Sequence, residues 1–300
     1  MYVITGATGN IGKVIAAELL SKNKQVRVLG LHNADKLNEF MAKGAEPFVG
    51  DVYDAEFVKK AFQGATAVYC VIPPNTHSND FRKDQQKVAR NYVNAVKENG
   101  VKNVLLLSSI GAHLRNGAGV VDGLGDMEEY FSELKNINVL NLRPSYFMEN
   151  IFGQMDMIKH NGIVGSAMKG DLHIPLVATK DIGAVGAKRL LDLNFKGNTV
   201  EFVLGPRDVT YNEIAHVIGK AIGKPDLKYV QFSYEDAKKG MVQSGFVSEN
   251  VAELFNGLAE AMNSGKSLNA HKRTSANSTP TTLEEFAKVF AHAYESPVVA

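Results

Sequence analysis

Short apolar runs alternate with segments of helical spacing through the first half of the chain. The runs that predict strands lie at 2–4, 26–29, 47–49, 67–72, 104–107 and 139–142. Between them, apolar residues recur about every 3.6 positions, as in 11–19, 57–62 and 88–96. Strands that are apolar on both faces and separated by helices predict a parallel sheet with helices on each side. Because crossovers are right-handed, the expected fold is α/β, a doubly wound, mainly parallel Rossmann sheet.

The second half of the chain mixes helical segments with one further strand. A helix at 178–193 and a strand at 200–204 predict that 178–205 completes the sheet of a domain covering 1–150. Two capping boxes, Thr210 with Glu213 and Thr281 with Glu284, each predict the start of a helix. We therefore expect 151–177 and 206–300 to form a smaller, mostly helical C-terminal lobe, with a polar surface loop at 265–279.

A glycine-rich loop follows the first expected strand and leads into the first helix. Its spacing is G-x-x-G-x-x-G, and the glycines would let backbone N–H groups approach a pyrophosphate at the helix N-terminus. The position between a strand and an amphipathic helix makes a dinucleotide site the favoured interpretation over a merely structural turn. The cofactor-binding residues expected here are Gly6, Thr8, Gly9, Asn10, Ile11 and Gly12.

Two later strand ends supply further candidates for cofactor binding. Asp51 follows the third strand, where its carboxylate could accept from an adenine amino group, cap the next helix, or do both. Val71, Ile72 and Pro73 follow the fourth strand, where proline would fix the loop beside the cofactor.

The end of the second strand bears on the choice between NAD and NADP. An acidic residue about 20 positions past the glycines would bind a ribose 2′-hydroxyl, but His32 stands there. His32, Asn33 and Lys36 could together hold a 2′-phosphate instead. NADP is therefore the expected cofactor, with NAD as the alternative.

Composition narrows the class of protein. The chain has 300 residues and a formal net charge of +1, without a basic run that would neutralise nucleic-acid phosphates. Its single cysteine, Cys70, lies in an apolar run and is expected to be buried. Neither a signal peptide nor a membrane-length apolar stretch is evident, so a cytoplasmic protein without a membrane partner is expected.

Taken together, several motifs resemble those of the NmrA-like family, atypical members of the short-chain dehydrogenase/reductase superfamily. The resemblance covers nearly the whole chain and implies an NAD(P)-binding Rossmann domain with a small lobe that closes a cleft. Family members include NADPH sensors, transcription co-regulators and reductases of quinones, imines or dyes. The motifs are Thr5 to Gly12, Gly50-Asp51, Ser108-Ser109, Glu128 to Phe131, Arg143 to Asn150 and Lys180 to Gly183.

The chain departs from its wider superfamily at the proton-handling pair. Dehydrogenases of that superfamily carry Tyr-x-x-x-Lys on the helix after strand five, whereas Tyr130 here is followed by Leu134. Related NmrA-like enzymes carry Lys or His four residues before Glu128, where this chain has Leu124. One Tyr-x-x-x-Lys does occur, at Tyr234 and Lys238, but it lies in the second lobe and is expected on a surface helix.

Residues at the ends of strands five and six are the remaining candidates for chemistry. Ser108 could touch the nicotinamide, and Ser109 and His113 are the candidate catalytic residues, although a capping serine and an exposed loop histidine are the plainer interpretations. Tyr146 and Phe147 could shelter the nicotinamide ring or simply pack in the core. No His, Cys or Asp cluster has metal-ligand spacing.

The favoured function is an NAD(P)H-dependent reductase that passes hydride to an electrophilic small molecule such as a quinone, imine or dye. Such an acceptor needs little beyond correct placement, so a missing Tyr–Lys pair is compatible with this chemistry. The alternatives are a non-catalytic NADP(H) sensor or co-regulator with a regulatory protein partner, and an enzyme resembling nucleotide-sugar epimerases or dehydratases.

Overall fold

Seven parallel strands form the main sheet, in the order β10-β6-β5-β4-β1-β2-β3. The computed structural model describes residues 1–31 and 34–296. Six strands confirm the apolar runs of the first half, and β10 confirms that a later strand returns to the sheet. The strands are β1 (Tyr2–Ile4), β2 (Val26–Gly30), β3 (Glu46–Val49), β4 (Ala67–Cys70), β5 (Asn103–Leu107), β6 (Asn138–Pro144) and β10 (Asn198–Val203).

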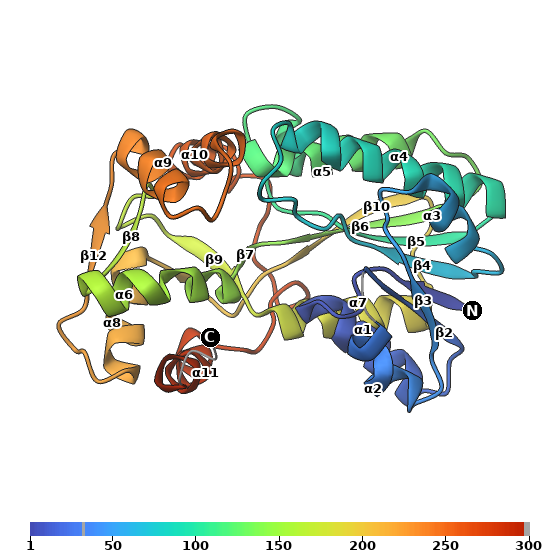
Figure 1. Ribbon diagram of the computed structural model, residues 1–300, viewed down its shortest axis with the longest axis horizontal. Coiled ribbons are helices and arrows are strands. Elements are labelled where there is room, and N and C mark those ends of the chain that lie inside the picture. The colour runs from blue at the N-terminus through green and yellow to red at the C-terminus, as the bar shows by residue number, and fades with distance from the viewer. Residues whose placement is uncertain (32–33, 297–300) are drawn as a thin grey trace.

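Helices cover both faces of this sheet, as a doubly wound fold requires (Figure 1). On one face lie α1 (Asn10–Ser21), α2 (Asn38–Met41) and α7 (Thr179–Asp192), which bury Ile15 and Ile182 in a shared core. On the other face, α3 (Ala55–Ala61), α4 (Phe81–Asn99) and α5 (Asp122–Ser132) bury Tyr92 and Phe131. The strand order reverses between β1 and β4, which is the point where such sheets bind ligands.

The rest of the chain builds a second lobe around its own apolar core (Figure 1). Its helices are α6 (Met155–Asn161), α8 (Tyr211–Ala221), α9 (Tyr234–Gln243), α10 (Glu249–Asn263) and α11 (Leu283–Glu295). Five short strands that the sequence did not predict are β7 (Tyr146–Phe147), β8 (Ile163–Ser166), β9 (Ile174–Val177), β11 (Asp208–Val209) and β12 (Lys228–Gln231). Among residues 1–31 and 34–296, no helix has both the length and the apolar character needed to cross a membrane.

The structure confirms one of the expected helix caps and corrects two others. Thr210 accepts a bond from the Glu213 N–H at 3.1 Å, as expected for the N-cap of α8. The capping box of α11 lies one residue later than predicted, at Thr282 and Glu285. Asp54, not Asp51, caps α3. The Asp51 carboxylate therefore does not cap that helix.

The segment 265–279 is more than the polar surface loop that was expected. The Leu204 N–H donates to Asn277 O at 2.8 Å, and the Thr279 N–H donates to Leu204 O at 2.8 Å. Ser267 in the same segment is fully buried. The loop thus packs against the end of β10, because its backbone pairs with a strand edge that the sequence pattern could not reveal.

Candidate functional site

The glycine loop between β1 and α1 adopts a turn that only small residues permit. Gly6 has φ +59°, and a Cβ atom there would lie 2.6 Å from Val71 Cγ1. At Gly12, a Cβ atom would lie 2.2 Å from Gly6 O. Both glycines are therefore required by the backbone path itself, whatever the loop binds.

The exposed side of this loop fits a pyrophosphate. Gly6, Thr8, Gly9 and Asn10 are exposed. The start of α1 has no side-chain cap and no acidic residue in its first turn. Free N–H groups and the positive end of the helix dipole therefore face outward, the arrangement that binds phosphate. Ile11 and Gly12 are buried, and Ile11 packs in the core of the sheet.

A threonine joins the glycine loop to the loop after β4. Thr5 Oγ1 donates to Tyr69 O at 3.0 Å and accepts from the Val71 N–H at 2.9 Å. Val71 and Pro73 remain partly exposed beside the glycine loop, while Ile72 is buried in the core. Of the three residues expected to bind the cofactor here, Val71 and Pro73 are therefore accessible and Ile72 is not.

The residues expected at the adenosine end lie on exposed loops. Asp51 is exposed and accepts a bond from the Tyr53 N–H at 2.9 Å. Lys36 is exposed within the short 3-10 helix η1 (Ala34–Leu37). His32 and Asn33 lie outside the described residues.

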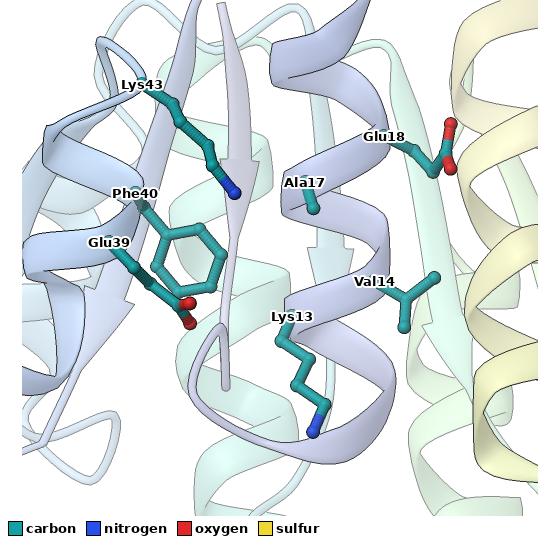
Figure 2. Close-up of a pocket in the computed structure, with 7 residues that line it drawn as sticks. All are labelled: Lys13, Val14, Ala17, Glu18, Glu39, Phe40 and Lys43. Carbon is teal, nitrogen blue, oxygen red and sulfur yellow. The ribbon is translucent and has the colours of Figure 1, made fainter.

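A groove of about 270 Å³ runs between α1 and α2 (Figure 2). Lys13 stands at the end of the groove where the glycine loop enters α1, and Lys43 stands at the opposite end. Sequence analysis missed Lys13, although its position directly after Gly12 indicates a place in the first turn of α1. Lys13 is therefore a second exposed cation on the adenosine side. The lining residues are Lys13, Val14, Ala17, Glu18, Glu39, Phe40 and Lys43.

A buried ionic network joins the ends of β5 and β6 to α5. The carboxylate of Glu128 accepts from the Ser108 hydroxyl and from Arg143 Nε, the latter at 2.9 Å, and forms an ion pair with the guanidinium. Ser108 is 2% exposed, so its hydroxyl is directed to Glu128, while the neighbouring Ser109 is partly exposed. Sequence analysis placed Glu128 in a motif but found neither of its partners.

Two histidines lie near this network. His113, in η2 (Ala112–Leu114), is half-buried, and burial together with the Arg143 charge lowers its pKa below the usual value of 6.5. The ring centroids of His271 and Phe202 lie 5.7 Å apart, and the Arg143 guanidinium lies 5.9 Å from the Phe202 centroid. The segment 265–279 thus contributes His271, which sequence analysis did not single out because the loop looked merely polar.

Strand β7 places one aromatic side chain in each lobe. Phe147 packs against the core of the main sheet, whereas Tyr146 packs against the core of the second lobe. Both residues are partly exposed, and β7 lies between the two lobes (Figure 1). The two residues predicted beside the nicotinamide therefore occupy the boundary between the lobes.

The tyrosines of the superfamily pattern have other contacts. The Tyr130 ring lies 4.2 Å from the Arg90 guanidinium, and Lys135 lies beyond the end of α5. Lys238 forms ion pairs with Glu249 at 3.2 Å and Glu253 at 2.9 Å. Neither tyrosine is supported by a lysine in the way that proton transfer at neutral pH requires.

The chain belongs to the NmrA-like family, whose sequence model matches residues 2–287. A curated relative, prestalk A differentiation protein A of Dictyostelium discoideum, is 26% identical over 95% of this chain and 91% of its own. An NADPH-dependent quinone oxidoreductase of Escherichia coli, solved with NADPH, has a TM-score of 0.82 at 22% identity, covering 97% and 99%. Triphenylmethane reductase of Citrobacter sp., solved with NADP(H), has a TM-score of 0.79 at 21% identity, covering 97% and 100%. These likenesses confirm the expected family and fold.

Proposed function

We propose that this protein is an NADPH-dependent reductase that transfers hydride to an electrophilic small molecule. The observation that supports this proposal most directly is the glycine loop. Its exposed N–H groups lie where the strand order of the sheet reverses. The NADPH and NADP(H) complexes of the two similar structures support NADP as the cofactor.

Different residues of the site would bind different parts of NADPH and the acceptor. N–H groups in the first turn of α1, beginning at Asn10, would hold the pyrophosphate, and Lys13 and Lys36 would attract a 2′-phosphate. Pro73 and Phe147 would flank the nicotinamide, which supplies the hydride when it is bound. Ser109 and His113 would face the acceptor as candidate hydrogen-bond donors.

The absence of a lysine-supported tyrosine favours acceptors that need little proton chemistry. Holding the two reacting carbons in contact can supply about 7–11 kcal/mol in the best cases. Water can then protonate the product. This reasoning supports quinones, iminium ions or dyes, and it weighs against ketone–alcohol exchange and nucleotide-sugar epimerisation, both of which use a tyrosine as proton carrier.

NADPH oxidation measured at 340 nm with a panel of acceptors tests the proposal. We expect turnover with at least one quinone, iminium or cationic dye, and none with unactivated ketones or UDP-sugars. Tight NADPH binding without turnover of any acceptor would contradict the reductase function and support a non-catalytic NADP(H) sensor. Failure to bind either dinucleotide would overturn both.

A further inference from the structure

Residues 265–279 form a strap that connects α10 to α11 (Figure 1). The first part of the strap packs on the loop after β5, since a Cβ atom at Gly111 would lie 3.2 Å from the Cβ of the fully buried Ser267. Its last part is bonded to the end of β10, where Leu204 donates to Asn277 O and accepts from the Thr279 N–H, both at 2.8 Å. The strap thus spans three neighbouring strands of the main sheet, from β5 across β6 to β10.

The middle of the strap is held by side chains. Arg273 donates to Gly205 O and to the Asp208 carboxylate. The His271 ring contacts the Phe202 ring of β10, with centroids 5.7 Å apart. Among the residues that the structure describes, no backbone hydrogen bond joins 268–273 to the main sheet. This part of the strap can therefore leave the sheet without breaking a strand pairing.

Two imidazoles lie where the strap meets the main sheet. His113 follows Gly111 by two residues, and His271 belongs to the strap itself. The Nδ1 atoms of both rings are buried, and neither has a hydrogen-bond partner within the described part of the chain. A neutral imidazole tolerates this, because one of its nitrogens carries no proton, whereas an imidazolium carries a proton on both. Protonation of the closed form would therefore leave a buried, unpaired N–H in each ring.

The charged groups around the two rings offer little compensation. They are Arg143 and Glu128 beside His113, and Asp208, Arg273 and His113 beside His271. Each carboxylate is already paired with the arginine next to it. Burial, helped by the nearby arginines, lowers the pKa of both histidines below the usual value of 6.5. A positive charge on either imidazole is therefore disfavoured while the strap lies on the sheet.

We propose that the strap is a pH-dependent gate, closed while His113 and His271 are neutral and opened when they bind protons. Opening lets water accept hydrogen bonds from both imidazolium nitrogens and screen the arginine charges. An exposed imidazole titrates near 6.5, so the closed form is favoured above about this pH and the open form gains as the pH falls below it. The open gate would expose the loop after β5, which carries Ser109 and His113. The gate does not depend on the reductase function.

Ser267→Cys provides a reporter for opening, because Ser267 is fully buried at the contact with Gly111 and its Oγ has no partner among the described residues. Labelling by dithiodipyridine is followed from pH 7.5 to 5.5, and each rate is divided by that of a cysteine peptide at the same pH. One histidine can raise the open fraction at most about tenfold over this range. With both histidines present, we expect the corrected rate to rise roughly 10- to 100-fold.

Histidine variants of this reporter test the cause of the rise. His271→Phe keeps a ring against Phe202 and should make the rise at least threefold smaller, and adding His113→Phe should abolish it. His216→Phe, on the exposed side of α8, is the matched control and should keep the full rise. In the unsubstituted protein, Cys70 is buried in β4, so its labelling reports loosening of the whole sheet and should not change.

Several outcomes would overturn the gate. They are a pH-independent rate in the reporter, an equal rise after both histidines are replaced, and a parallel rise at Cys70, which would mean that the whole sheet loosens. NMR titration of His271 in the unsubstituted protein tests the gate without a reporter. An apparent pKa below 6.5 supports it, and a value at or above 6.5 overturns it, because the closed strap would then not oppose protonation.

Discussion

At Gly9 of the glycine loop the backbone has φ −80° and ψ 164°, a conformation that any residue can adopt. A Cβ atom there would lie 3.3 Å from Gly6 O, a tight contact that small shifts can relieve. We predict that Gly9→Val folds but loses at least 10²-fold in affinity for NADPH and NADH, because its branched side chain fills the pyrophosphate approach. Calorimetry on the wild type and the variant measures this loss.

Gly12→Val provides the contrast. Its Cβ would overlap Gly6 O at 2.2 Å, so this variant should unfold at a lower temperature than Gly9→Val. Unchanged dinucleotide affinity in a folded Gly9→Val protein would show that the cofactor does not lie on this loop.

At the level of single residues, sequence predicts what depends on local spacing. The three loop glycines could be found because a turn, a close approach and a helix start all fall within seven positions. The partners of Glu128 could not be predicted from sequence, because Ser108 is 20 positions away, just after β5, and Arg143 is 15 positions away, on β6. His271 reaches the same region only through the path of a loop.

At the level of elements, the groove between α1 and η1–α2 bears on cofactor choice. We predict that Lys13→Met combined with Lys36→Met lowers the NADPH:NADH affinity ratio roughly three- to tenfold, since each exposed ion pair contributes about 0.2–1 kcal/mol. Lys43→Met removes the same charge from the far end of the groove and should leave the ratio unchanged (Figure 2). A wild-type ratio in the double variant would mean that other residues hold the 2′-phosphate.

The contact between α4 and α5 gives a pH-dependent prediction. Asp126 accepts two bonds from Arg82 at 2.7 Å and one from Gln86 at 2.8 Å. Burial alone would raise the pKa of Asp126, but these hydrogen bonds and the Arg82 charge lower it below its usual value. The Asp126 carboxylate therefore stabilises the fold fully above its pKa in the unfolded chain, about 3.9. This stabilisation is lost as the pH falls through the lower pKa that Asp126 has in the folded protein.

We predict that Asp126→Asn lowers the free energy of unfolding at pH 7 by about 1–3 kcal/mol. The difference from wild type should shrink as pH falls below about 3.9, because the unfolded carboxylate is protonated there and the folded one follows at its lower pKa. Denaturant titrations across this range measure both effects. Glu129→Gln on the same helix breaks an exposed pair with Arg115 and should change stability little at any pH; a constant Asp126→Asn deficit would contradict the linkage.

Elements of four or more residues with clear periodicity were predictable, whereas the short strands of the lobe were not. Strand β7 has two residues and β11 has two, too few for an alternating pattern to be recognised. The start of α11 was misplaced by one residue because Thr281 and Thr282 both fit a capping box by spacing. Thr282 caps the helix because the Thr281 hydroxyl instead donates a hydrogen bond to Asp181, a contact that is distant in sequence.

At the level of the whole molecule, two carboxylates at the start of α7 connect the lobes. Glu149, from the segment that leaves the main sheet, accepts from the Thr179 N–H at 3.0 Å and from its hydroxyl at 2.6 Å. Asp181 accepts from the Thr281 N–H at 3.1 Å and from its hydroxyl at 2.9 Å, 100 positions along the chain. Both carboxylates belong to motifs that carried the family resemblance, and their contacts give those motifs a structural role.

The Asp181 contact predicts how the lobe is held in place. Asp181→Ala should lower the free energy of unfolding by about 1–3 kcal/mol, because it leaves two buried donors of Thr281 without their acceptor. It should also speed trypsin cleavage within 265–281, where Lys272 and Arg273 lie. Asp192→Ala on the same helix removes only an exposed pair with Lys188 and should match wild type within about 0.5 kcal/mol. Equal effects of the two variants would mean that apolar packing alone joins α11 to the main sheet.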